Sequence, residues 1–219
     1  MKGKDLIKVV TGIRRCGKST LFELFIKYLK EIGINDDEII QINLEDADYD
    51  FDGYKELYNY INSKLDAKKK YYIFLDEVQN VPEFQKAVDS LYIKKNVDVY
   101  ITGSNAYLLS GELATLLSGR HVEIKMLPLS FKEYISAFKG NNNYQQLFLE
   151  YMKNGDMPEN IPLLKTNPND LDKYLDGIFS TNVYKDIMAR NNIADKVLLE
   201  SILKFIFDSI GSPISTKNK

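Results

Sequence analysis

The sequence has little cysteine: Cys16 is the only one among 219 residues, so no disulfide can form within the chain. It also lacks any apolar run close to the roughly 18 residues that a membrane-spanning helix needs. An excess of positive charge is missing too, because 29 Lys and Arg residues stand against 31 Asp and Glu residues, a net charge of −2. No global basic field therefore argues for nucleic acid. These absences predict a reducing, cytoplasmic setting and no membrane partner.

What is present is an alternation of apolar segments with two different periods. At 44% hydrophobic and 27% charged residues, the composition is typical of a folded globular chain. The predicted strands cover residues 6–11, 39–44, 71–75, 97–102 and 122–126. The predicted helices between them cover residues 18–32, 54–65, 82–95 and 106–118. Strands that alternate with helices predict an α/β fold, a parallel sheet with helices on both faces.

After Pro128 the strand pattern stops. Helices are predicted over residues 130–139, 144–153, 170–190 and 196–210, and the stretch 155–169, which holds three prolines, is predicted to be a loop. The core is therefore expected to end near residue 127, and an all-helical region is expected after it. The last residues, 214–219, look like the opening of another helix, so we expect the sequence to be part of a longer protein.

A glycine-rich motif follows the first predicted strand. Gly12 to Ser19 read G-I-R-R-C-G-K-S, between a β-branched run and an amphipathic helix. In this context the motif predicts a P-loop, whose backbone N–H groups and helix N-terminus bind a polyphosphate. Lys18 is expected to contact the β- and γ-phosphates of ATP, and Ser19 to ligate Mg²⁺. The predicted nucleotide-binding residues are Gly12, Ile13, Arg14, Arg15, Cys16, Gly17, Lys18, Ser19 and Thr20.

Two acids end the third predicted strand. Four apolar or aromatic residues precede Asp76 and Glu77, so a buried strand delivers both carboxylates to the carboxyl edge of the sheet, where ligands bind in α/β folds. Asp76 is predicted to hold Mg²⁺ through water, and Glu77 to polarise the water that attacks the γ-phosphate. The alternative is a strand that ends in a solvated acidic turn.

Polar residues near two later strands have open roles. Asn105, or else Ser104, ends the fourth predicted strand and is a candidate sensor of the γ-phosphate and the attacking water. The alternative is that either residue only caps the next helix. Arg120 precedes the fifth strand and is a candidate arginine finger that acts on a neighbouring subunit's nucleotide. The alternatives are a surface arginine or one paired with a carboxylate of its own subunit.

Four segments together resemble the AAA+-type P-loop ATPases of archaea and bacteria whose core precedes a domain of unknown function. They are GIRRCGKST, IFLDEVQNVPEF, ITGSNAYLLSGELATLLSGR and LPLSFKEY. The resemblance covers about residues 6–215. The strand-and-helix unit between the P-loop strand and the Asp76 strand is characteristic of P-loop ATPases with a catalytic glutamate, an AAA+/ASCE-like arrangement. It implies the strand order 5-1-4-3-2.

The resemblance also implies a division of the chain and a function. Residues 1–127 would form the ATPase core, 128–168 a helical lid-like region, and 169–219 a helical segment that leads into a winged-helix-like domain. A motif similar to G-G-F-P-E opens the second part, with Asp156 in place of the second glycine. The implied activity is hydrolysis of Mg-ATP by a homo-oligomer completed by Arg120, and a later domain is the implied place of any DNA contact. The alternative is a slow nucleotide-dependent switch that acts on DNA or a protein partner.

Overall fold

The computed structural model describes residues 6–104, 117, 119–138, 140, 143–181, 187–188 and 195–213. The chain divides into two compact units, Met1–Leu171 and Asp172–Lys219. Each unit is described by itself. Among the described residues, no helix is both long and apolar enough to cross a membrane.

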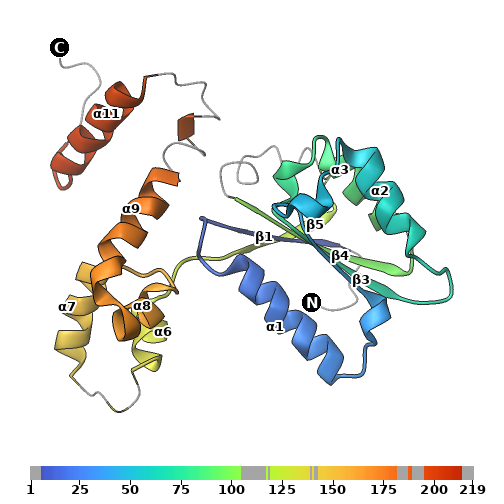
Figure 1. Ribbon diagram of the computed structural model, residues 1–219, viewed down its shortest axis with the longest axis horizontal. Helices are drawn as coiled ribbons and strands as arrows, with labels where there is room; N and C mark the ends of the chain where they lie inside the picture. The colour runs from blue at the N-terminus through green and yellow to red at the C-terminus, as the bar shows by residue number, and fades with distance from the viewer. Residues whose placement is uncertain are drawn as a thin grey trace. The chain divides into compact units, whose positions relative to one another are not determined.

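The first unit is built around a five-stranded sheet (Figure 1). The strands are β1 (Ile7–Gly12), β2 (Ile39–Asn43), β3 (Tyr71–Asp76), β4 (Val97–Ser104) and β5 (His121–Lys125). All four neighbouring pairs are parallel, and the order is β2-β3-β4-β1-β5. Read from the other side, this is the predicted order 5-1-4-3-2, so the α/β fold of P-loop NTPases is confirmed. The carboxyl ends of β1, β3 and β4 consequently lie next to one another.

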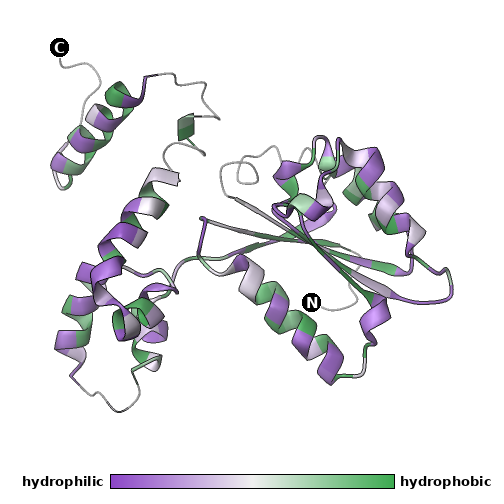
Figure 2. Ribbon diagram, viewed as in Figure 1, coloured by the Kyte–Doolittle hydropathy of each residue, from purple (hydrophilic) through white to green (hydrophobic). Residues whose placement is uncertain are grey.

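Helices cover both faces of this sheet (Figure 1). They are α1 (Lys18–Glu31) on one face, and α2 (Tyr54–Ser63) and α3 (Phe84–Tyr92) on the other. Alternate strand residues supply the two cores: Val10 faces Phe22 and Leu29 of α1, whereas Val9 belongs to the core that Leu57 of α2 completes. Figure 2 shows the strands as mostly hydrophobic and the helices as mixed, as expected for a sheet buried on both faces.

A buried ion pair interrupts the apolar face that α1 covers. The Lys8 ammonium on β1 pairs with the Asp98 carboxylate on β4, and both side chains are almost fully buried. Tyr100 Oη donates a hydrogen bond of 3.0 Å to Asp98 Oδ2, and burial together with the Asp98 charge raises the pKa of Tyr100. A charge in this position is retained because its partner is buried beside it, since an unpaired buried charge costs several kcal/mol.

The rest of the first unit is helical, as predicted, with one correction. Its helices are α6 (Phe131–Ser136), α7 (Tyr144–Asn154) and α8 (Asn160–Thr166). The prediction of a loop over 155–169 is wrong for α8. Pro162 is the third residue of that helix, where its missing N–H would have no intrahelical partner anyway. Asn160 fixes the start of α8, because its fully buried side chain donates a 2.7 Å hydrogen bond to the Asn154 carbonyl.

The second unit contains α9 (Leu171–Thr181), which begins at the unit boundary, and α11 (Lys196–Asp208). Both confirm predicted helices in part, although residues 182–186 and 189–194 lie outside the described residues. Phe179 of α9 and Phe207 of α11 contact each other, with ring centroids 6.5 Å apart. The predicted boundaries at residues 127 and 168 stay predictions.

Candidate functional site

The loop between β1 and α1 has the backbone of a P-loop. A Cβ on Gly12 would lie 2.6 Å from Cys16 Sγ and 2.7 Å from the Met126 carbonyl oxygen, closer than packed atoms approach, so only glycine fits. Gly17 has a φ of 100°, in the left-handed region that favours glycine, and directly precedes α1. Arg15 also has a positive φ, of 67°. The loop therefore curls back immediately before the amino end of α1, as a P-loop does.

Lys18 lies inside this loop rather than in solvent. Its side chain is 4% exposed, and Nζ donates hydrogen bonds of 3.2 Å to the carbonyl oxygens of Gly12 and Ile13. Nζ also lies 3.5 Å from Glu77 Oε1. The loop thus holds a full positive charge where the motif predicts the phosphates, with an acid from the neighbouring β3 end beside it.

The remaining loop residues form the rim and floor of the candidate site. Arg14 Nη1 pairs with Glu45 Oε1 at 3.2 Å, while Ser19 and Thr20 are exposed at the start of α1. Cys16 is buried, and burial raises the pKa of its thiol despite the nearby Lys18 charge. A protonated thiol is a poor nucleophile, so Cys16 serves as a small floor residue.

The structure brings the two acids to the predicted edge. Asp76 ends β3, and both Asp76 and Glu77 are less than a tenth exposed. Glu77 has a φ of 55° and a ψ of 52°, a left-handed conformation that non-glycine residues seldom adopt. This turn aims the Glu77 carboxylate back toward Lys18. The solvated-turn alternative is inconsistent with their burial.

Sequence reasoning missed Thr102, which holds both acids in place. Its Oγ1 donates a hydrogen bond to Asp76 Oδ1 and accepts one of 3.0 Å from the Glu77 N–H. Thr102 is fully buried on β4, beside the end of β3. The available signal was a threonine near the carboxyl end of the fourth predicted strand, two residues before Ser104 and three before Asn105.

We expect Thr102→Val, which keeps the side-chain shape, to lower the free energy of unfolding by about 1–3 kcal/mol. The substitution leaves the Glu77 N–H and one Asp76 oxygen buried without this partner. Urea unfolding of the wild type, Thr102→Val and Thr102→Ser would measure the effect. Thr102→Ser keeps the hydroxyl and should cost less; equal losses in the two variants would show that the hydroxyl contributes nothing.

Asn105 lies outside the described residues, and so does the Ser104 side chain, so the sensor assignment stays a prediction. Arg120 is placed at the opposite edge of the sheet from the P-loop. It precedes His121, which pairs with Ile7 at the amino end of β1, whereas Gly12 ends that strand. At ~3.3 Å per residue the two ends of β1 are about 17 Å apart. Arg120 is therefore too distant to serve the nucleotide site of its own chain.

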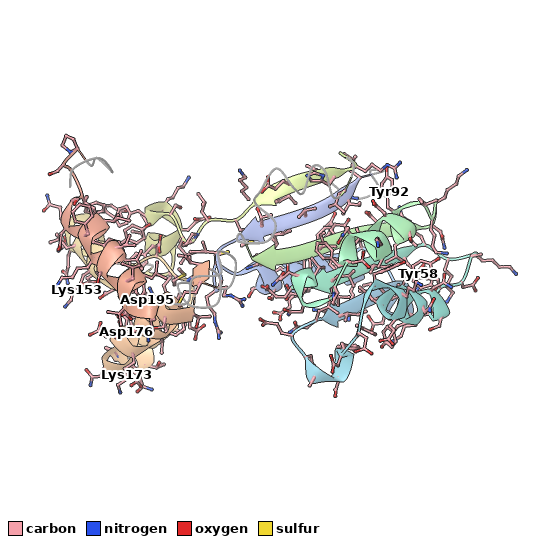
Figure 3. All side chains as sticks on the ribbon, turned by 90° about the horizontal axis from the view of Figure 1, so that it is seen from above. Tyr58, Tyr92, Lys153, Lys173, Asp176 and Asp195 are labelled. Carbon is pink, nitrogen blue, oxygen red and sulfur yellow. The ribbon has the colours of Figure 1, made fainter. Side chains whose placement is uncertain are left out.

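The Arg120 guanidinium instead lies over the ring of Tyr92, at 5.7 Å from its centroid. Tyr92 is the last residue of α3 (Figure 3). Its charge also acts on Asp89. Burial raises the pKa of the Asp89 carboxyl, and the Arg120 charge offsets only part of this rise. Arg120 remains exposed overall. The guanidinium thus has a supporting contact within its own chain and is also exposed to solvent.

The oxygen donors fit a magnesium ion that shares its ligands with a nucleotide. Ser19 offers a hydroxyl at the start of α1, and Asp76 offers a carboxylate at the end of β3. Among the residues that the structure describes, no group of three or more His, Cys, Asp or Glu side chains forms a metal cage. Mg²⁺ commonly uses one or two protein oxygens and takes its other ligands from phosphates and water.

Comparisons with known proteins agree with this arrangement. A family model described as "AAA domain" matches residues 4–135. An uncharacterized protein of Haemophilus influenzae is 39% identical over 98% of this chain and 54% of its own length. The uncharacterized protein MJ1544 of Methanocaldococcus jannaschii is 32% identical over 96% of this chain and 48% of its own. The chain thus spans about half the length of these relatives.

Two solved structures show a more distant similarity. PCH-2 of C. elegans is 16% identical, with a TM-score of 0.44, over 69% of this chain and 41% of that one. The Aeropyrum pernix ORC1 protein, solved in complex with DNA, is 13% identical, with a TM-score of 0.48, over 77% of this chain and 55% of that one.

Proposed function

Because this chain belongs to the AAA domain family, we propose that it binds Mg-ATP and hydrolyses it to ADP and phosphate in order to drive a conformational change. One observation carries the proposal: the Lys18 ammonium of the P-loop and the Glu77 carboxylate at the end of β3 lie 3.5 Å apart. The positive charge of Lys18 complements the negative charge of a triphosphate, and the Glu77 carboxylate can act as the base that activates water.

The proposed binding step starts from the P-loop backbone. The N–H groups of the loop and of the first turn of α1 would bind the β- and γ-phosphate oxygens. Lys18 Nζ would exchange the carbonyls of Gly12 and Ile13 for these oxygens, which carry more negative charge. Ser19 and Asp76 would hold Mg²⁺, which when bound neutralises charge on the phosphates.

In the proposed chemical step, Glu77 accepts a proton from the attacking water. The water oxygen then bonds to the γ-phosphorus, and the bond from that phosphorus to the bridging oxygen breaks, with ADP as the leaving group. Thr102 fixes the positions of the Glu77 backbone and the Asp76 carboxylate through its two hydrogen bonds. Since phosphoryl transfer depends mostly on positioning and charge, a rigid acid pair next to Lys18 suits it.

The experiment that tests this function is phosphate release by the purified chain with ATP and Mg²⁺, measured over a range of protein concentrations. Steady turnover supports the ATPase. The switch alternative, in which bound nucleotide rearranges the helices for DNA or a protein partner, instead predicts tight ADP binding and negligible turnover. Binding without any turnover would overturn the hydrolase proposal.

We further propose that Arg120 acts on the nucleotide of a neighbouring subunit in a homo-oligomer. Arg120→Ala is then expected to spare ATP binding and to remove the rise of turnover per subunit with protein concentration, because the transition state loses a positive charge supplied in trans. Phosphate release and ATP titration measure the two effects.

Lys94→Ala is the matched control for Arg120→Ala, because Lys94 Nζ lies 5.8 Å from the centroid of the Tyr58 ring, a comparable contact. This control should leave turnover unchanged. A lower melting temperature for Arg120→Ala, with the concentration dependence intact, would assign Arg120 a structural role on Tyr92.

A further inference from the structure

Gln79 extends the proposed site beyond the residues already assigned. It lies in the short 3-10 helix Val78–Asn80, directly after Glu77. Its Nε2 donates a hydrogen bond to Glu77 Oε2, while Glu77 Oε1 faces Lys18. The Glu77 carboxylate is therefore held between a cation from the P-loop and an amide from its own turn.

The oxygen of the same Gln79 amide makes no hydrogen bond to the described residues. This oxygen, Oε1, is buried. A buried acceptor without a partner costs about 1–3 kcal/mol, so such an atom calls for an explanation. Of the five such atoms in the described part of the chain, Gln79 Oε1 belongs to a side chain that donates a hydrogen bond to Glu77. Because this side chain contacts Glu77, the proposed hydrolytic site is where a partner for the oxygen is sought.

The turn that carries Gln79 is fixed on both sides. Val78 is fully buried in the core, and Asn80 Nδ2 donates a 3.2 Å hydrogen bond to the Leu44 carbonyl. The Asn80 N–H donates to the Glu77 carbonyl at 3.1 Å. A rigid turn suits a group that must point at a small ligand, because little freedom remains to be lost on binding.

We propose that Gln79 orients the attacking water together with Glu77, which deepens the proposed hydrolysis and rests on it. The water donates one hydrogen bond to Glu77 and the other to Gln79 Oε1, and this directs an oxygen lone pair at the γ-phosphorus. During attack Glu77 takes the first proton. Gln79 takes no proton. The water proton that was hydrogen-bonded to Gln79 stays on the oxygen that becomes part of the released phosphate. The same division between a glutamine that positions water and a charge that stabilises the phosphates operates in other P-loop enzymes.

Gln79→Met, which keeps the length of the side chain but removes the amide, tests this proposal in the full chain. Loss of one oriented hydrogen bond is expected to lower kcat by about tenfold and to leave KM within about twofold. Gln85→Leu is the matched control, because Gln85 is a half-buried glutamine on α3, and this variant should turn over like the wild type. Thermal unfolding confirms that each variant is folded, and Gln79→Ala serves if Gln79→Met is not.

Two phosphate analogues separate water orientation from general support of the fold. ADP with aluminium fluoride mimics the transition state with its attacking water, and ADP with beryllium fluoride mimics bound ATP. Gln79→Met should weaken binding of the first by about tenfold and leave the second unchanged. Equal weakening of both would assign Gln79 a purely structural role and overturn the proposal.

A double variant separates a direct contact with water from an effect through Glu77. If Gln79 contacts the water itself, Gln79→Met made in the Glu77→Gln background should weaken aluminium fluoride binding further. No further loss would overturn the direct contact. If the wild type is active and Gln79→Met turns over normally, the role of Gln79 is wrong but the proposed hydrolysis stands. If the wild type itself is inactive, the proposed hydrolysis is wrong as well.

Discussion

Lys18→Ala is expected to abolish the rise in melting temperature that ATP gives the wild-type chain. A ligand at 100 times its Kd stabilises a folded protein by about 2.7 kcal/mol, and that gain disappears when binding is lost. Lys18 is the buried cation of the P-loop, with Nζ at 3.2 Å from two loop carbonyls, so its removal leaves the phosphates without their central positive charge. Thermal unfolding with and without Mg-ATP measures the difference.

The same variant should also lower the melting temperature of the nucleotide-free protein, because Glu77 would keep a buried carboxylate without its cationic neighbour. Lys86→Ala is the matched control, since Lys86 forms an exposed ion pair with Glu83 on the surface. Water screens exposed pairs, so they contribute little to stability, and this control should change neither quantity by much. An undiminished ATP shift in Lys18→Ala would contradict the proposed nucleotide site.

Local sequence patterns predicted the sheet and the P-loop because both depend on neighbouring residues. The β-branched run before Gly12 forms β1, and the G-K-S step begins α1 at Lys18, as predicted. The strand order followed from the place of the Asp76 strand relative to the P-loop strand. The strand and P-loop signals each lie within a short stretch of chain, whereas the strand order came from the resemblance to P-loop ATPases.

Contacts between distant segments could not be predicted in this way. Lys8 and Asp98 appeared as two charges in separate strands, and only the pairing of β1 with β4 makes them a buried pair. Thr102 likewise gained its role from the register of β3 against β4. Gln79 is close to Glu77 in sequence, but its contact depends on the left-handed turn at Glu77, which no residue preference indicates.

Proline was the misleading signal in the helical region. Three prolines between residues 155 and 169 indicated a loop, although Pro162 occupies the first turn of α8 without loss of a hydrogen bond. The deciding feature was Asn160, whose buried side chain ties the start of α8 to the end of α7. A polar residue that is buried by tertiary contacts carries no periodic signature in the sequence.

Glu77→Gln is expected to reduce ATP turnover by about 10²–10⁴-fold, the usual contribution of a positioned general base. An amide is nearly isosteric with the carboxylate and can keep a partner in Gln79, but it cannot take the proton of the attacking water. Phosphate release from enzyme with ATP already bound isolates this step from binding. Glu45→Gln is the matched control, because Glu45 is the acid that pairs with Arg14 at the rim of the P-loop.

The same substitution should strengthen ATP binding by about tenfold, equivalent to ~1.4 kcal/mol. Glu77 Oε1 lies 3.5 Å from Lys18 Nζ, and this attraction must be given up if Lys18 turns to the phosphates. Glu77→Gln removes that competition together with a negative charge that repels the nucleotide. Titration with a fluorescent ATP analogue measures the affinity. Unchanged turnover and unchanged affinity together would show that Glu77 neither activates water nor lies near bound nucleotide.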